Sequence, residues 1–224
     1  AQSMTQKPLE EEQIQLFFSD IEPLAASKVL VRLENETLSI GQRILSQGLQ
    51  LTVRGQDKIG IIGPNGVGKS TLLAKLHQLL SGKREISLGF MPQDYQETLQ
   101  LDLSPVEFLS QTGHKEEIQK IQSHLASLNF SYPEMHHQIH SLSGGQQGKL
   151  LLLNLVLRKP NFLLLDEPTR NFSPTSQPEI RKLFATYPGG LVTVSHDRRF
   201  LKEVCTSIHS LTEHGLELVD LQDL

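Results

Sequence analysis

The sequence has a single cysteine, Cys205, among its 224 residues, which excludes an internal disulfide and indicates a reducing compartment. It also lacks any apolar run near the roughly 20 residues that a membrane-spanning helix requires. An excess of one charge is missing too, since the formal net charge is −4 at pH 7 and gives no overall sign of nucleic-acid binding. These absences predict a soluble, cytoplasmic protein. Its length suits one domain with a large core, or a core with a small subdomain.

A glycine-rich segment follows a predicted strand, Lys58–Ile62. It has the phosphate-loop pattern of glycine, any four residues, and then glycine, lysine and serine or threonine. Glycines let the backbone turn several N–H groups toward a polyphosphate. Lys69 adds positive charge, and the Ser70 hydroxyl suits Mg²⁺. The residues of the loop are Gly63, Pro64, Asn65, Gly66, Val67, Gly68, Lys69, Ser70 and Thr71.

A helix is predicted directly after this loop, because leucines recur there at helical spacing. They are Leu72, Leu73, Leu76, Leu79 and Leu80. A position between strand and helix is the context that a phosphate loop requires. It favours nucleotide binding over the alternative, a purely structural glycine turn.

Two carboxylates follow a second apolar run. The segment Phe162–Asp166 is typical of a strand buried on both faces of a parallel sheet, and ligands bind at the carboxyl ends of such strands. Asp166 is therefore predicted to hold Mg²⁺, and Glu167 to act as the general base for an attacking water. Solvated acids that merely end a strand are the alternative, and the phosphate loop upstream disfavours it.

Two further segments point to the same chemistry. Ser143 is a good N-cap for an apolar helix, and Gly144 and Gly145 leave backbone donors there for an anion. Later, His196 follows a predicted strand at 191–195, where it could contact a γ-phosphate. A surface histidine is the alternative for His196, and the order of the motifs favours the functional interpretation.

With these motifs in this order, residues 28–212 resemble an ABC-type ATPase domain. The resemblance matches 63–71 to the Walker A loop, Gln93 to the Q-loop glutamine and Phe162–Asp166 to the Walker B strand. It matches 142–146, including Ser143, Gly144, Gly145 and Gln146, to the signature. Glu167 corresponds to the catalytic glutamate and His196 to the switch histidine.

The resemblance implies an α/β fold of the P-loop NTPase type with an antiparallel β subdomain and a small helical subdomain at about 93–140. It implies hydrolysis of ATP with Mg²⁺, with Ser70, Gln93 and Asp166 as metal ligands and Lys69, Glu167 and His196 as catalytic residues. It also implies a composite site, in which Ser143, Gly144, Gly145 and Gln146 of a partner cassette close over the nucleotide. That partner is a second cassette of the same full-length chain or a second copy.

Within the superfamily the chain is most similar to the second cassette of ABC-F proteins, which act on the ribosome. The sequences of residues 166–169 and 195–200 support this similarity, and 7–12 resembles the tail of a linker between cassettes. We therefore expect a linker tail or partly ordered segment at 1–27 and an ABC domain at 28–224, in a ribosome-associated translation factor or antibiotic-resistance protein. The motor subunit of a membrane transporter and a nucleotide sensor without turnover are the alternatives.

The chain departs from the ABC-F pattern at two places. Residues 170–174 read Arg-Asn-Phe-Ser-Pro, so Ser173 replaces an aspartate that would couple the two sites. Ile40 stands where the family often has an aromatic residue against the base. Base–aromatic stacking contributes up to about 1–3 kcal/mol, so weaker discrimination between bases is expected.

Other patterns concern the fold alone. Alternating apolar residues at 29–53 predict antiparallel strands. Ser104 and Glu107 form a predicted capping box, and an amphipathic stripe follows it. Residues 1–27 are polar and acidic apart from an apolar cluster at 16–21, and they are expected to form a partial helix packed on the domain or a frayed tail. The histidines at 136, 137 and 140 are attributed to a solvated loop rather than a metal site.

Overall fold

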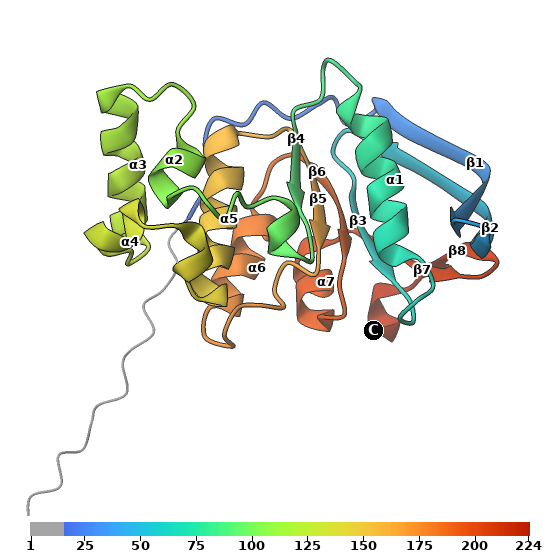
Figure 1. Cartoon of the computed structure of the whole chain (residues 1–224). Helices are drawn as coiled ribbons and strands as arrows, with labels where there is room; N and C mark the ends of the chain where they lie inside the picture. Colours follow the sequence, from blue (N-terminus) through green and yellow to red (C-terminus); the bar gives the residue numbers. More distant parts are fainter. Residues whose placement is uncertain (1–15) are drawn as a thin grey trace, which may run out of the picture.

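The computed structural model describes residues 16–224. Its centre is a six-stranded sheet in the order β4-β5-β6-β3-β7-β8 (Figure 1). The first five strands in this order are parallel, and β8 pairs antiparallel with β7. The strands are β3 (Lys58–Ile62), β4 (Leu88–Met91), β5 (Phe162–Asp166), β6 (Gly190–Val194), β7 (Ser207–Thr212) and β8 (Gly215–Val219).

The central strands are covered on both faces, as their apolar sequences predict. All five residues of β5 and of β6 are buried. Successive side chains of a strand point to opposite faces, and β5 follows this rule, because Leu163 and Leu165 join one core cluster while Phe162 and Leu164 join the other. The domain therefore has three layers, with the sheet in the middle.

One outer layer consists of helix α1 (Lys69–Ser81) and the hairpin of β1 (Val29–Ile40) and β2 (Arg43–Arg54). The hairpin is a separate antiparallel pair, so the predicted antiparallel β subdomain is confirmed. The buried Ser46 joins it to the main sheet, since its hydroxyl donates to the Thr212 carbonyl at 2.6 Å. Lys75 of α1 forms an ion pair with Glu36 of β1 at 2.8 Å.

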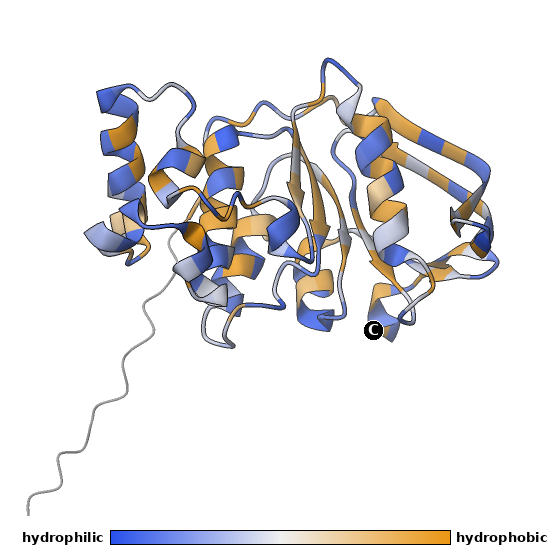
Figure 2. Ribbon diagram, viewed as in Figure 1, coloured by the Kyte–Doolittle hydropathy of each residue, from blue (hydrophilic) through white to orange (hydrophobic). Residues whose placement is uncertain are grey.

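The opposite layer consists of α5 (Gly144–Arg158), α6 (Gln177–Ala185) and α7 (Arg198–Val204). Beyond α5 lie the short helices α2 (Pro105–Leu109) and α4 (Tyr132–His136) and the longer α3 (Lys115–Ser127) (Figure 1). Within residues 16–224 there are also three single 3₁₀ turns: η1 (Tyr95–Glu97), η2 (Ile139–Ser141) and η3 (Leu221–Asp223). Figure 2 shows hydrophobic residues along the central strands and on the inward sides of these helices.

Local signals set the helix ends. Ser104 accepts from the Glu107 amide at 3.2 Å, and the Glu107 carboxylate accepts from the Ser104 amide at 3.1 Å, so the predicted capping box is present. On α3, Ile121 and Leu125 are buried, as the stripe predicts. Helices α2, α3 and α4 fall within the segment expected for a helical subdomain. The limits of that subdomain, at about 93–140, stay a prediction.

The structure corrects one expectation within the described N-terminal part. Residues 16–21 contain no helix. They lie against the domain in irregular backbone, with Leu16 buried and the Phe18 ring 4.8 Å from that of Tyr187. Apolar side chains can be buried by an extended segment as well as by a helix, and this cluster is too short to fix a helical period. The predicted linker tail at 7–12 lies outside the described residues.

Candidate active site

A cavity of about 860 Å³ opens where the parallel strands end at their carboxyl termini. Its walls come from the phosphate loop, the ends of β5 and β6, and the β1–β2 hairpin. Among the predicted site residues, the structure brings these to its wall: Asn65, Gly66, Gly68, Lys69, Ser70, Thr71, Gln93, Asp166, Glu167 and His196. Residues 100 or more positions apart in the sequence therefore face one space.

The phosphate loop has the backbone that its glycines permit. Gly63 and Gly68 have positive φ angles of 153° and 106°, a region that side chains disfavour. A Cβ on Gly63 would lie 2.7 Å from the Leu211 carbonyl oxygen, so this close approach also requires glycine. Gly68 is the N-cap of α1, and the N-terminus of that 13-residue helix therefore points its free N–H groups into the loop.

Lys69 lies across the loop with its ammonium toward the cavity. Its Nζ donates to the carbonyl oxygens of Gly63 and Pro64, the latter at 3.1 Å, and lies 3.4 Å from Nε2 of His196. Burial lowers the pKa of Lys69, while the carboxylates of Glu167 and Asp166 raise it. Lys69 is thus a buried cation with two acids close to it.

Ser70 and Asp166 meet at the floor of the cavity. The Ser70 hydroxyl donates to Oδ2 of Asp166 at 2.8 Å. Asp166 is 6% exposed, and its Oδ1 has no hydrogen-bond partner among residues 16–224. Burial raises the pKa of Asp166, and the hydrogen bond from Ser70 opposes that rise. A buried carboxylate oxygen without a partner, beside a hydroxyl, is a donor set that fits a hard cation such as Mg²⁺.

Glu167 has an unusual backbone conformation directly after β5. Its φ is +51°, which is uncommon for a residue other than glycine and is often found at functional sites. Its Oε1 contacts Nδ1 of His196, and its Oε2 accepts from the His196 amide at 3.2 Å. The side chain of Glu167 is 11% exposed and that of His196 57%. The pair therefore links the ends of β5 and β6 at the cavity wall.

The predicted signature residues do not join this cavity. Ser143 caps α5 with a full capping box to Gln146, so the predicted N-cap is present. A Cβ on Gly144 or Gly145 would meet nothing within 4 Å. None of the four residues from 143 to 146 lines the cavity. Within the described chain, the signature thus presents an open helix start away from the phosphate loop.

Sequence reasoning missed several wall residues, among them Thr169, Arg170, Gln177 and Asp197. The Thr169 hydroxyl donates to Asp197 Oδ2 at 3.0 Å, and Asp197 also caps α7 by accepting from the Phe200 amide. The capping position of Asp197 was readable from the sequence, but its contact with Thr169 depends on the order of strands.

The two departures also have definite places. Ile40 is 62% exposed and lines the cavity together with Leu45, so an aliphatic surface stands at the hairpin side. The Ser173 hydroxyl donates to Ser176 Oγ at 3.2 Å, beside the start of α6. The side chain at 173 is thus bonded within its own turn.

Comparison with known proteins gives matches to ABC transporter and ATP-binding proteins. The sequence model of the ABC transporter family matches residues 46–170. The chain is 30% identical over 210 residues to the probable ATP-binding protein YheS of Escherichia coli K12, a match that covers 91% of this chain and 33% of that protein. It is 26% identical to the ABC transporter F family member 2 of Arabidopsis thaliana, over 96% of this chain and 33% of that protein. The chain therefore spans about a third of the length of these relatives.

The fold is also similar to a solved structure of the ATP-binding cassette MJ0796, a dimer bound to ADP and phosphate. The TM-score is 0.70 at 20% identity, and the match covers 85% of this chain and 98% of that one. No helix within residues 16–224 is both long and apolar enough to cross a membrane.

Proposed function

The chain belongs to the ABC transporter family of ATP-binding domains, and on that basis we propose that it binds ATP with Mg²⁺ and hydrolyses it. One observation carries this proposal: Lys69, Ser70, Asp166, Glu167 and His196 face a single cavity at the start of α1. These are a phosphate-binding cation, a hydroxyl and carboxylate for a metal, and a carboxylate–imidazole pair. Together they provide the groups that phosphoryl transfer to water requires.

The binding step uses the loop and the floor of the cavity. The amides at the start of α1 and the Lys69 ammonium would hold the phosphates, and Lys69 would exchange its loop carbonyls for phosphate oxygens. Ser70, Asp166 and Gln93 would hold Mg²⁺, which neutralises charge on the phosphates when it is bound.

The chemical step uses Glu167 and His196. Glu167 would accept a proton from a water that attacks the terminal phosphorus, while the bond to the bridging oxygen breaks and ADP leaves. His196 holds the Glu167 carboxylate and would contact the terminal phosphate. General-base catalysis usually contributes about 10²–10⁴-fold, so Glu167→Gln should lower turnover by about that factor without loss of ATP binding. Hydrolysis at the parent rate would refute this role.

We also propose that a partner cassette completes the site. The open start of α5 supports this, because Gly144 and Gly145 have free space around them but do not line the cavity of their own chain. The dimeric state of MJ0796 supports the same arrangement.

Mixing two defective variants tests this pairing. Lys69→Ala removes the cation of the phosphate loop and keeps the signature, whereas Gly145→Asp keeps the loop and puts a negative charge at the signature. Each should be inactive alone, and a mixture should recover hydrolysis, since one of its composite sites has both intact halves. Gly145→Ala is the matched control and should stay active. A mixture no more active than either variant would exclude pairing between two copies.

The partner proteins are proposed from the relatives. Similarity to an ABC transporter F family member supports an ABC-F type cassette from a longer chain, acting on the ribosome in translation or antibiotic resistance, and so in the cytoplasm. Sedimentation of the full-length protein with ribosomes, in a manner that depends on ATP, would support this. Its recovery with membranes instead would support a transporter motor. ATP binding without any single-turnover hydrolysis would leave a nucleotide sensor, a function that the Ser173 and Ile40 departures favour slightly and that Glu167 argues against.

A further inference from the structure

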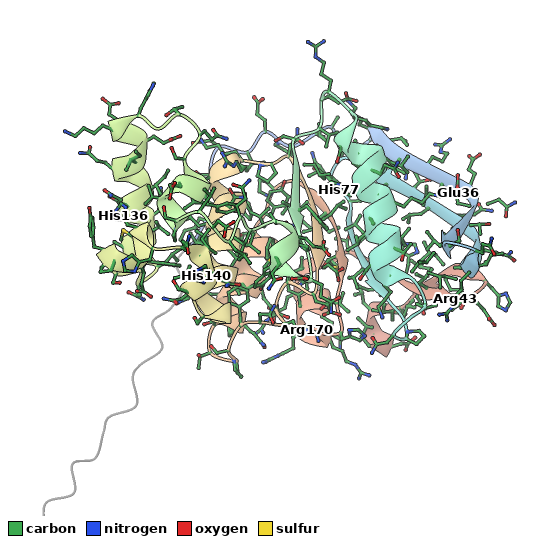
Figure 3. All side chains as sticks on the ribbon, in the orientation of Figure 1. Glu36, Arg43, His77, His136, His140 and Arg170 are labelled. Carbon is green, nitrogen blue, oxygen red and sulfur yellow. The ribbon has the colours of Figure 1, made fainter. Side chains whose placement is uncertain are left out.

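Arg170 lies on the wall between two cavities. Besides the cavity of about 860 Å³, a second one of about 600 Å³ adjoins it. The residues that line both are Ser70, Gln93, Asp166 and Arg170. Figure 3 labels Arg170 at the lower rim of the molecule, below the central sheet. Arg170 thus shares its wall with Ser70, Gln93 and Asp166, the three residues proposed to hold the metal.

The backbone on both sides of Arg170 is fixed. Its amide donates to the Glu167 carbonyl at 3.2 Å. The Gln177 side chain donates to the carbonyls of Thr169 and Phe172, at 3.4 and 3.1 Å, and Phe172 is only 6% exposed. The Arg170 side chain is by contrast exposed, and it forms no ion pair with any residue in the described part of the chain. A fixed backbone therefore presents an uncommitted guanidinium to the cavities.

The side chains that line the cavities include more carboxylates than cations. Among the described residues that line the two cavities, Lys69 and Arg170 are the only lysine and arginine. They face the carboxylates of Asp94, Glu97, Asp166, Glu167 and Asp197. A triphosphate adds several more negative charges. Guanidinium groups match phosphate oxygens with paired hydrogen bonds, so Arg170 has the chemistry to offset them.

The position of Arg170 indicates which end of the nucleotide it would contact. Ile40 and Leu45 line only the larger cavity, at the hairpin side. Ser70 and Asp166 line both, and they would hold the metal that neutralises charge at the reacting end of the triphosphate. We propose that Arg170 is a phosphate-binding residue that contacts the terminal phosphate and so distinguishes ATP from ADP. This inference rests on the proposed function.

The test is a comparison of affinities by calorimetry, with a β,γ-imido analogue of ATP plus Mg²⁺ and with ADP plus Mg²⁺. A hydrogen bond to a charged group usually changes affinity by about tenfold or more. Arg170→Ala should therefore weaken the analogue about tenfold and ADP less than about twofold. Arg170→Lys, which keeps the charge and loses the paired geometry, should fall between. Arg198 is exposed near the site and lines neither cavity, so Arg198→Ala controls for net charge and should change neither affinity.

Several results would overturn the inference. They are an unchanged analogue affinity in Arg170→Ala, an equal loss for ADP, or an equal loss in Arg198→Ala. In all three the parent chain still binds the analogue, so the nucleotide binding in the proposed function stands. If the parent chain binds neither nucleotide, the proposed function fails together with this inference. Circular dichroism of each variant separates loss of folding from loss of the contact between Arg170 and the phosphate. The milder Arg170→Lys variant serves the same purpose.

Discussion

Gly148 offers a demanding test of how the site is packed. It is the fifth residue of α5 and is buried. A Cβ on it would lie 2.8 Å from Phe172 Cζ and 3.1 Å from Tyr95 Oη. Both neighbours are buried, Phe172 to 6% and Tyr95 to 8% exposure, so neither can swing into solvent. Gly148 is therefore the point where α5, the turn after Glu167 and the 3₁₀ turn η1 meet.

The expected effect of Gly148→Ala is the difference of two terms. Alanine is favoured over glycine within a helix by up to about 1 kcal/mol. Overpacking of a filled core usually costs about 1–3 kcal/mol, and contacts this short should reach the upper part of that range. We therefore expect a net loss of about 1–2 kcal/mol in the free energy of unfolding. That corresponds to about 2–4 °C in Tm for each kcal/mol.

Urea unfolding of Gly148→Ala, Gly145→Ala, Phe172→Leu and the double variant of Gly148→Ala with Phe172→Leu measures the effect. Gly145→Ala lies on the same helix with open space around its Cβ, so it should be neutral or slightly stabilising. Phe172→Leu shortens the obstructing side chain, and in the double variant it should return part of the lost stability, with a coupling of about 1 kcal/mol. If Gly148→Ala is as stable as Gly145→Ala, the close packing of these three segments is refuted.

Three other predictions concern single side chains. Hydrogen bonds from Ser110 and from the amides of Thr112, Gln111 and Gly113 lower the pKa of Glu117 to about 2. Its contribution to stability should therefore be full above the unfolded pKa of about 4.3 and disappear as the pH falls toward 2. Urea midpoints of Glu117→Gln and the parent should thus differ at pH 7 and converge at pH 2, and a constant gap would contradict this.

Asp166→Asn removes a buried charge and should stabilise the chain by about 1 kcal/mol in EDTA while hydrolysis is lost; a lower urea midpoint would count against it. The Thr193 hydroxyl is buried and has no hydrogen-bond partner among residues 16–224, so Thr193→Val should be neutral or stabilising by up to about 1 kcal/mol, with a clear drop in Tm as the contrary result.

Much of the fold was predictable because its signals are local. The strand Lys58–Ile62 has the predicted bounds, and the helix after it begins at Lys69. The capping box predicted at Ser104 and the N-cap predicted at Ser143 are both formed. Each of these depends on a few neighbouring residues whose hydrogen bonds close within one turn. At these points the sequence predicts the structure, because the hydrogen bonds that form it join close neighbours in the chain.

The contacts that join distant segments were not predictable in this way. The hydrogen bond from Thr169 to Asp197 exists because β5 and β6 are neighbours in the sheet. Leu16 is buried in a core cluster with residues of α5, α6 and α7, which lie more than 100 positions later in the sequence. Neither a capping pattern nor a hydrophobic period contains strand order. These contacts could be found only from the assembled fold.

The segment from Arg170 to Ser173 shows how the two levels of description differ. In the sequence, Ser173 replaces the aspartate that would couple the two ATP sites, so the segment indicates weaker communication between those sites. In the structure, Phe172 is buried and Gln177 holds its carbonyl, so the replaced segment has a fixed backbone of its own. This fixed backbone places Arg170 on the wall that Asp166 also lines, so only the rotamer freedom of the Arg170 side chain remains to be lost when it contacts a ligand. The segment therefore lacks a carboxylate at Ser173 and has a cation three residues earlier, at Arg170. The net charge near a bound triphosphate would thus be more positive than with an aspartate at 173.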